Sequence, residues 1–103
     1  MIKVEVRKVN EKITSLSLSG HAGSGEYGHD LVCAAVSAIF VGGCSALENQ
    51  SSFTIQIKEG NSHLKLKDEK KLSKHDEIVL ETVLIQLRNI EQDYKKFIKI
   101  EIL

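Results

Sequence analysis

Apolar and polar residues alternate along several short segments of the chain, a pattern typical of strands with one buried face. The alternating apolar positions are Ile2, Val4 and Val6; Leu16 and Leu18; Phe53, Ile55 and Ile57; Leu64 and Leu66; and Ile98, Ile100 and Ile102. Charged or hydroxyl-bearing residues occupy most of the positions between them. The pattern therefore predicts a mostly antiparallel sheet with one face in water and helices on the other.

A segment without any charged residue, from Leu31 to Leu47, predicts the first helix. Asp30 precedes it and is a good N-cap residue. The segment is close to the minimum length of a membrane span, but it is rich in Gly, Ala and Ser. Such a composition suits a helix that packs closely against a sheet or a partner, so we expect a core helix and no membrane association.

The second helix is predicted to begin after Ser73, whose side chain can cap it, and to end near Tyr94. Its expected core-facing stripe is Val79, Val83, Leu87, Ile90 and Tyr94, with Glu81, Arg88 and Glu91 facing water. Turns are expected at Asn10-Glu11 and at Glu59-Gly60-Asn61. The predicted fold is a single α+β domain over residues 1–103, with two helices packed on the sheet in the order ββαββαβ.

Composition narrows the possible environments and partners. The chain has 14 basic and 14 acidic residues, so no broad electrostatic field would hold it on RNA or on an anionic membrane. Its N-terminal residues alternate like a strand and do not resemble a signal peptide. Two cysteines without a dense framework fit free thiols in a reducing compartment, so we expect a cytoplasmic location.

Candidate chemistry lies in the segment from Gly20 to Ser37, which reads GHAGSGEYGHDLVCAAVS. Cys33 would occupy the first turn of the first helix, where the helix dipole favours a thiolate. A helix terminus contributes roughly 0.3–1 kcal/mol, whereas one pKa unit corresponds to about 1.36 kcal/mol. A second positive charge is needed, and His21 can supply it as an imidazolium.

Between these two residues, Ala22 to His29 form a loop with glycines at Gly23, Gly25 and Gly28. Glycines permit positive φ, so we interpret the loop as a gate over the site. His29 is the alternative general base, and Asp30 can either cap the helix or orient His21. Tyr27 and Phe40 are candidate substrate contacts.

Other residue groups favour ordinary structural roles. Cys44 falls within the apolar helix and is expected to be a core residue. His63 and His75 are expected to be exposed. Zinc held by His21, His29, Asp30 and Cys33 is not favoured, because the chain lacks closely paired ligands. We therefore predict no metal and no cofactor.

The His-Ala pair, the glycine-bearing loop and the segment GHDLVCAAVS, residues 28–37, together resemble the Prp family of ribosomal-processing cysteine proteases. The resemblance implies a catalytic dyad of His21 and Cys33, matches Asp30 to the family's aspartate, and suggests a homodimer. It also implies removal of a short apolar and aromatic N-terminal extension from a large-subunit ribosomal protein, whose mature N-terminus reaches toward the peptidyl-transferase centre, in the bacterial cytoplasm. The alternative is a non-catalytic, ribosome-associated peptide-binding module.

Overall fold

The computed structural model describes residues 1–23 and 30–103. Within them, five strands form one sheet in the order β3-β4-β2-β1-β5. The strands are β1 (Ile2–Val9), β2 (Lys12–Ser19), β3 (Phe53–Gln56), β4 (Asn61–Leu66) and β5 (Ile98–Ile102). All neighbours are antiparallel except β5, which pairs parallel with β1. The predicted α+β class, the element order and the mostly antiparallel sheet are confirmed.

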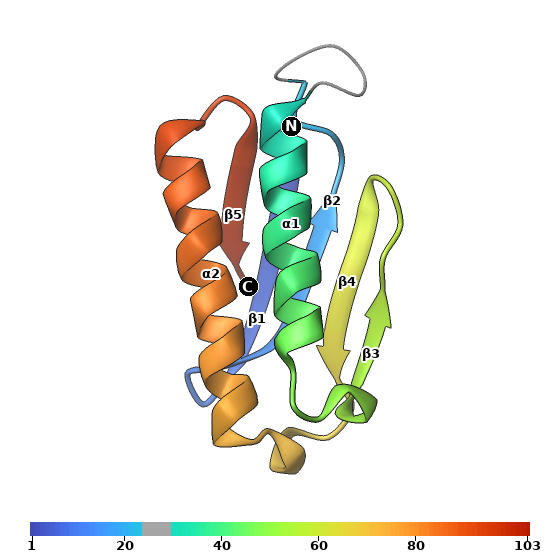
Figure 1. The fold of residues 1–103 in the computed structure, drawn as a ribbon. Helices are drawn as coiled ribbons and strands as arrows, with labels where there is room; N and C mark the ends of the chain where they lie inside the picture. Colours follow the sequence, from blue (N-terminus) through green and yellow to red (C-terminus); the bar gives the residue numbers. More distant parts are fainter. Residues whose placement is uncertain (24–29) are drawn as a thin grey trace.

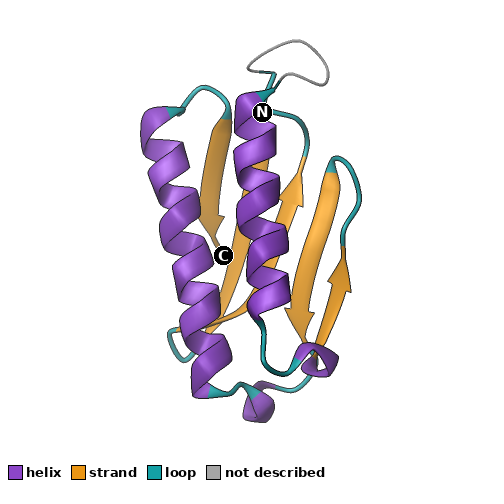
Figure 2. Ribbon diagram, viewed as in Figure 1, coloured by secondary structure: helices purple, strands orange, loops and turns teal. Residues whose placement is uncertain are grey.

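Helices α1 (Leu31–Ala46) and α2 (Lys74–Asp93) lie side by side on one face of the sheet and leave the other face open (Figures 1 and 2). Single turns of 3-10 helix, η1 (Gln50–Ser52) and η2 (Glu69–Lys71), precede β3 and α2. The two helices approach closely at Gly43, where a Cβ atom would collide with Val83. Fully buried side chains fill the space between the layers, namely Val4, Val6, Leu16, Leu64, Phe40, Leu80 and Leu87.

Both predicted turns are confirmed. Asn10 and Glu11 have φ of 51° and 67° between β1 and β2, as a two-residue hairpin turn with positive φ at both positions requires. The β3–β4 turn is closed by a hydrogen bond of 3.1 Å from the N–H of Asn61 to the carbonyl of Lys58. Its third residue, Gly60, has φ of 73°, which the third position of a type II turn demands.

Helix α2 begins after the Ser73 cap, as predicted, but its buried face differs from the predicted stripe. Val83 and Leu87 are buried together with Leu80 and Leu84. Tyr94 is 44% exposed, because it is the C-cap residue and lies beyond the last helical turn. The periodicity predicted the helix correctly, but the buried face is rotated slightly about the helix axis relative to the predicted stripe.

Three smaller predictions are also wrong. Ile57 is exposed because β3 ends at Gln56. His63 is half-buried because it lies within β4, an interior strand of the sheet. Glu91 is half-buried and does not simply face water, since its carboxylate accepts a hydrogen bond of 2.7 Å from the N–H of Ile100.

Helix α1 packs through Val32, Val36, Phe40, Gly43 and Cys44, as expected for a core helix. Across the described ranges, no helix has both the length and the apolar character that crossing a bilayer requires.

Candidate active site

A cavity of about 540 Å³ lies where the end of β2, the beginning of α1 and the β3–β4 turn meet. The beginning of α1 and the β3–β4 turn lie at the same end of the molecule in Figure 1. It is lined by Ile2, Leu18, Gly20, His21, Gly23, Asp30, Cys33, Ala34, Val36, Ser37, Glu59, Gly60 and Asn61. Ile2, Leu18 and Val36 give it apolar lining, because each belongs to the buried core. The cavity therefore brings His21 and Cys33 to one surface, next to apolar side chains.

Cys33 is positioned by the cap of α1. Asp30 has an extended backbone, and its carboxylate accepts a hydrogen bond of 3.0 Å from the N–H of Cys33. Cys33 therefore lies in the first helical turn, as predicted. Its sulfur is half-buried and accepts a hydrogen bond of 3.3 Å from the N–H of Ala22. This bond joins the sulfur directly to the residue after His21.

The surroundings of Cys33 favour the thiol over the thiolate. Burial raises the pKa of Cys33; the hydrogen bond from Ala22 lowers it, and the hydrogen bond and negative charge of Asp30 raise it, with a net increase. The helix terminus alone was expected to fall short of producing a thiolate, and burial and the carboxylate of Asp30 oppose its effect. Because burial and the adjacent carboxylate favour the protonated sulfur, a nearby base would be needed to form the thiolate.

Removing the charge of Asp30 should make Cys33 more reactive. Asn is as good an N-cap as Asp, so Asp30→Asn keeps α1 capped and removes the negative charge that raises the cysteine pKa. A lower pKa increases the thiolate fraction but weakens its nucleophilicity, so we expect alkylation by iodoacetamide at pH 7.5 to accelerate roughly twofold to threefold. Alkylation that is unchanged or slower would show that the carboxylate does not control the thiol.

His21 is presented to the cavity by a glycine with an unusual backbone. It follows Gly20, directly after β2, and Gly20 has φ of 86°. A Cβ atom at Gly20 would lie 2.5 Å from the carbonyl oxygen of Met1, so a side chain cannot fit there. His21 itself is exposed. The chain thus turns sharply out of the sheet and places the imidazole beside the cavity.

Asp30 serves as the cap of α1, which is one of the two roles that the sequence left open.

In the described part of the chain, metal-ligating side-chain atoms lie close together at Glu48, His75 and Asp76. Glu48 follows the end of α1, and the other two residues lie in the first turn of α2. Both oxygens of Asp76 already accept backbone hydrogen bonds there. His29, one of the four ligands weighed for zinc, lies outside the described residues.

The remaining site predictions have mixed outcomes. Cys44 is buried, as predicted. Phe40 is 1% exposed and part of the core, so its interpretation as a substrate contact is wrong. Gly23 lines the cavity with φ of 70°. The other predicted loop residues, Gly25, Tyr27, Gly28 and His29, lie outside the described residues, and the gate remains a prediction.

The sequence analysis did not predict that the β3–β4 turn lines the cavity. Glu59, Gly60 and Asn61 were expected to form a turn, but nothing in the sequence placed them next to His21. That proximity depends on the pairing of β2 with β4, in which Ser19 faces Asn61. A glycine turn at the end of a strand was the available signal, and alone it does not identify a site.

Comparison with known proteins gives a consistent result. Residues 1–99 match the model of a peptidase family described as cysteine protease Prp. Ribosomal processing cysteine protease Prp of Staphylococcus aureus is 32% identical over 97% of both chains, and that of Bacillus subtilis is 29% identical over 97% of this chain and 96% of the relative. The crystal structure of the S. aureus protease with a covalently linked product peptide superposes with a TM-score of 0.88, at 32% identity and full coverage of both chains.

Proposed function

This chain belongs to the cysteine protease Prp family, and we propose that it removes the N-terminal extension of a large-subunit ribosomal protein, with Cys33 as nucleophile and His21 as general base. Family membership makes it a cysteine protease and decides against the non-catalytic binding module. A ribosomal substrate places the proposed activity in the bacterial cytoplasm. The proposed substrate is a peptide segment, and the chain carries equal numbers of basic and acidic residues. We therefore propose that the protein makes no direct contact with nucleic acid.

One observation carries the proposal: Cys33 and His21 line the same cavity, and the sulfur is hydrogen-bonded to the residue that follows the histidine. The only other cysteine, Cys44, is buried in the core and does not line that cavity. The related S. aureus protease was crystallised with a covalently linked product peptide, which fits a nucleophilic mechanism.

The proposed reaction begins when His21 takes the proton of the Cys33 thiol. The sulfur then forms a bond to the scissile carbonyl carbon, and the developing oxyanion accepts hydrogen bonds from first-turn N–H groups of α1. The imidazolium returns its proton to the leaving amine as the C–N bond breaks, which leaves a thioester. Water activated by His21 hydrolyses the thioester and regenerates the thiol. Because Asp30 occupies the N–H of Cys33, the other first-turn amides are the available donors.

Mass spectrometry of the extended ribosomal-protein precursor, incubated with this protein, tests the proposed substrate. We expect a single cut that releases the extension. The same precursor without its extension is the control and should remain intact. Cleavage at several unrelated sites, or none, would contradict the assignment of this substrate while leaving the family membership untouched.

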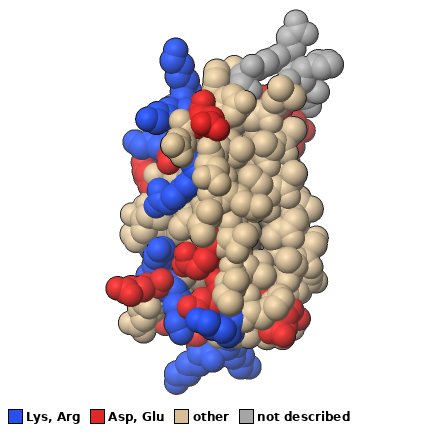
Figure 3. All heavy atoms as spheres, turned by 60° about the vertical axis from the view of Figure 1, so that its left-hand side comes forward, with Lys and Arg blue, Asp and Glu red and all other residues tan. Residues whose placement is uncertain are grey.

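The outer surface of the two helices supports a homodimer. Helix α1 has no charged residue, and Ile78 and Ile85 of α2 are 56% and 58% exposed. Charged side chains gather along one side and at the lower end of the view in Figure 3, and a broad uncharged surface lies beside them. We propose that a second copy covers this surface, since exposed apolar side chains such as Ile78 and Ile85 on an uncharged surface are typical of a protein interface.

Light scattering after gel filtration should therefore report twice the mass of 11.5 kDa. Ile78→Glu places a charge on the proposed interface and should shift the protein to the monomer. Ile57 is also 52% exposed but follows the edge strand β3, so Ile57→Glu is the matched control and should remain dimeric. A monomeric wild-type protein at micromolar concentration would rule out this interface.

A further inference from the structure

We propose that Gly60, at the tip of the β3–β4 hairpin, is a positioning residue for His21: its lack of a side chain lets the imidazole lie against the hairpin, which holds the general base beside Cys33. The inference rests on the proposed His21–Cys33 dyad. The inference assigns a role in the reaction to a turn that contains neither His21 nor Cys33 and is distant from both in sequence.

The close approach of His21 to the turn is the first observation. A Cβ atom built on Gly60 would lie 3.0 Å from Nε2 of His21 and 3.4 Å from its Cε1. The three heavy atoms nearest to that position all belong to the imidazole ring. A methyl group at residue 60 would therefore meet the ring first, and the ring would have to move.

A backbone hydrogen bond also connects the His21 segment to the β3–β4 turn. The N–H of Gly20 donates a hydrogen bond of 3.0 Å to the carbonyl of Gly60. Gly20 directly precedes His21, so this bond fixes the start of the histidine segment on the hairpin. The ring and the backbone of the segment thus both rest on the same glycine.

The hairpin is itself braced, so it can act as a fixed support. The hydroxyl of Ser62, which is buried, donates to the carbonyl of Lys58 at 3.0 Å and accepts from the N–H of Lys58 at 3.1 Å. These bonds, with the Asn61-to-Lys58 turn bond, tie the two sides of the turn together.

Packing against the hairpin matters because little else holds the ring. His21 is exposed, and within residues 1–23 and 30–103 no hydrogen bond reaches its imidazole. An exposed side chain without such a bond samples several rotamers unless packing restricts it. Contact with Gly60 supplies that restriction, and an imidazole displaced by even about 1 Å is a much poorer base.

A double-mutant cycle tests the proposal, with the rate of Cys33 alkylation between pH 6 and 10 as the measurement. Gly60→Ala should slow alkylation at pH 7 roughly tenfold in the wild-type background and shift the pH profile toward that of His21→Ala. In the His21→Ala background, the same substitution should change the rate less than about twofold, because the ring that the methyl group meets is gone. The strain of alanine at positive φ is present in both backgrounds and cancels.

Gly60→Asn is the second variant, because asparagine tolerates positive φ but still carries a Cβ atom. It should fold and show the same coupling to His21. Lys65→Ala on β4 is the control, since its side chain belongs to the same hairpin, is exposed and does not line the cavity, and it should leave the profile unchanged. Equal slowing by Gly60→Ala in both backgrounds would overturn the positioning role alone. A pH profile indifferent to His21→Ala would overturn the dyad itself, and with it this role.

Discussion

Cleavage of the extended precursor should fall by a factor on the order of 10³ or more in the Cys33→Ala variant, because removing a covalent nucleophile eliminates the acyl-enzyme route. The folded state should be nearly unaffected. Cys33 is half-buried at the edge of a cavity, and its sulfur accepts a hydrogen bond from the N–H of Ala22, so we expect the free energy of unfolding to change by about 1 kcal/mol or less. Mass spectrometry of the precursor, together with urea denaturation, measures both effects.

Cys44→Ala is the matched control for this experiment. Cys44 is on the same helix but is 5% exposed and belongs to the core. Its replacement should leave precursor cleavage intact and cost about 1 kcal/mol of stability through a small cavity. Rapid cleavage by Cys33→Ala, or its loss in Cys44→Ala with the fold preserved, would assign the nucleophile elsewhere.

Local features of the active site could be predicted from sequence because they depend on near neighbours. The cap at Asp30 and the position of Cys33 in the first turn of α1 involve residues three positions apart. The φ of Gly60 likewise follows from turn chemistry within four residues. These features need no knowledge of how the sheet is assembled.

Features that depend on assembly could not be predicted. The β3–β4 turn borders His21 only because β4 pairs with β2, although the sequence shows only that each strand forms a hairpin with its chain neighbour. The pKa of Cys33 is raised by burial, and the extent of burial emerges only when the cavity is formed. The argument from the helix dipole did not include this opposing effect.

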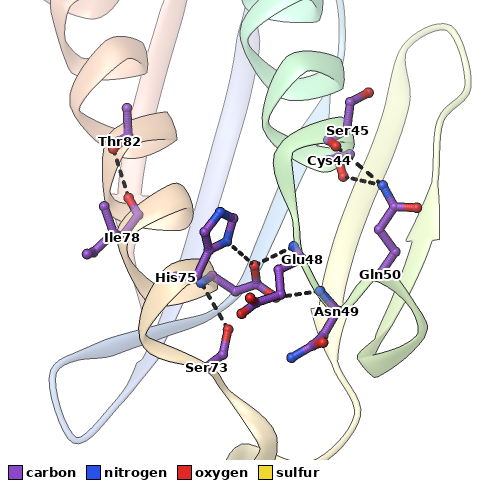
Figure 4. Close-up of polar contacts among 10 residues, drawn as sticks. Cys44, Ser45, Glu48, Asn49, Gln50, Ser73, His75, Ile78 and Thr82 are labelled. Atoms are coloured by element: carbon purple, nitrogen blue, oxygen red, sulfur yellow. Dashed lines mark hydrogen bonds and ion pairs between the residues drawn. The ribbon is translucent and has the colours of Figure 1, made fainter.

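Asp76 is the clearest example of a role that sequence could not reveal. Its position near the start of α2 predicts only a favourable interaction with the helix dipole. In the structure it is 1% exposed, and its two oxygens accept hydrogen bonds of 2.7 and 3.0 Å from the N–H groups of Glu48 and Asn49. Figure 4 shows how Glu48, Asn49, Ser73 and His75 lie close together at this place. Nδ1 of His75 lies 2.9 Å from the same carboxylate. One side chain therefore joins the start of α2 to the segment that follows α1.

We expect Asp76→Ala to lower the free energy of unfolding by about 3–5 kcal/mol, because it leaves two backbone N–H groups without their acceptor. For a domain of this size, that corresponds to a fall in Tm of roughly 15 °C or more. Asp68 is the control, since its carboxylate accepts one backbone hydrogen bond, at the cap of η2, and the residue is exposed. Asp68→Ala should cost about 1 kcal/mol or less.

The contribution of Asp76 should also depend on pH. Burial alone would raise the pKa of Asp76, but the hydrogen bonds from His75, Glu48 and Asn49 outweigh it and lower the pKa below its ordinary value. A carboxyl group with a lowered folded pKa contributes stability that is complete above its unfolded pKa, about 3.9, and is lost as the pH falls through the folded pKa. In urea titrations, the stability difference between wild type and Asp76→Asn should therefore shrink once the pH falls below about 4. A difference that stays constant down to pH 2 would show that the ionised carboxylate is not what connects these segments.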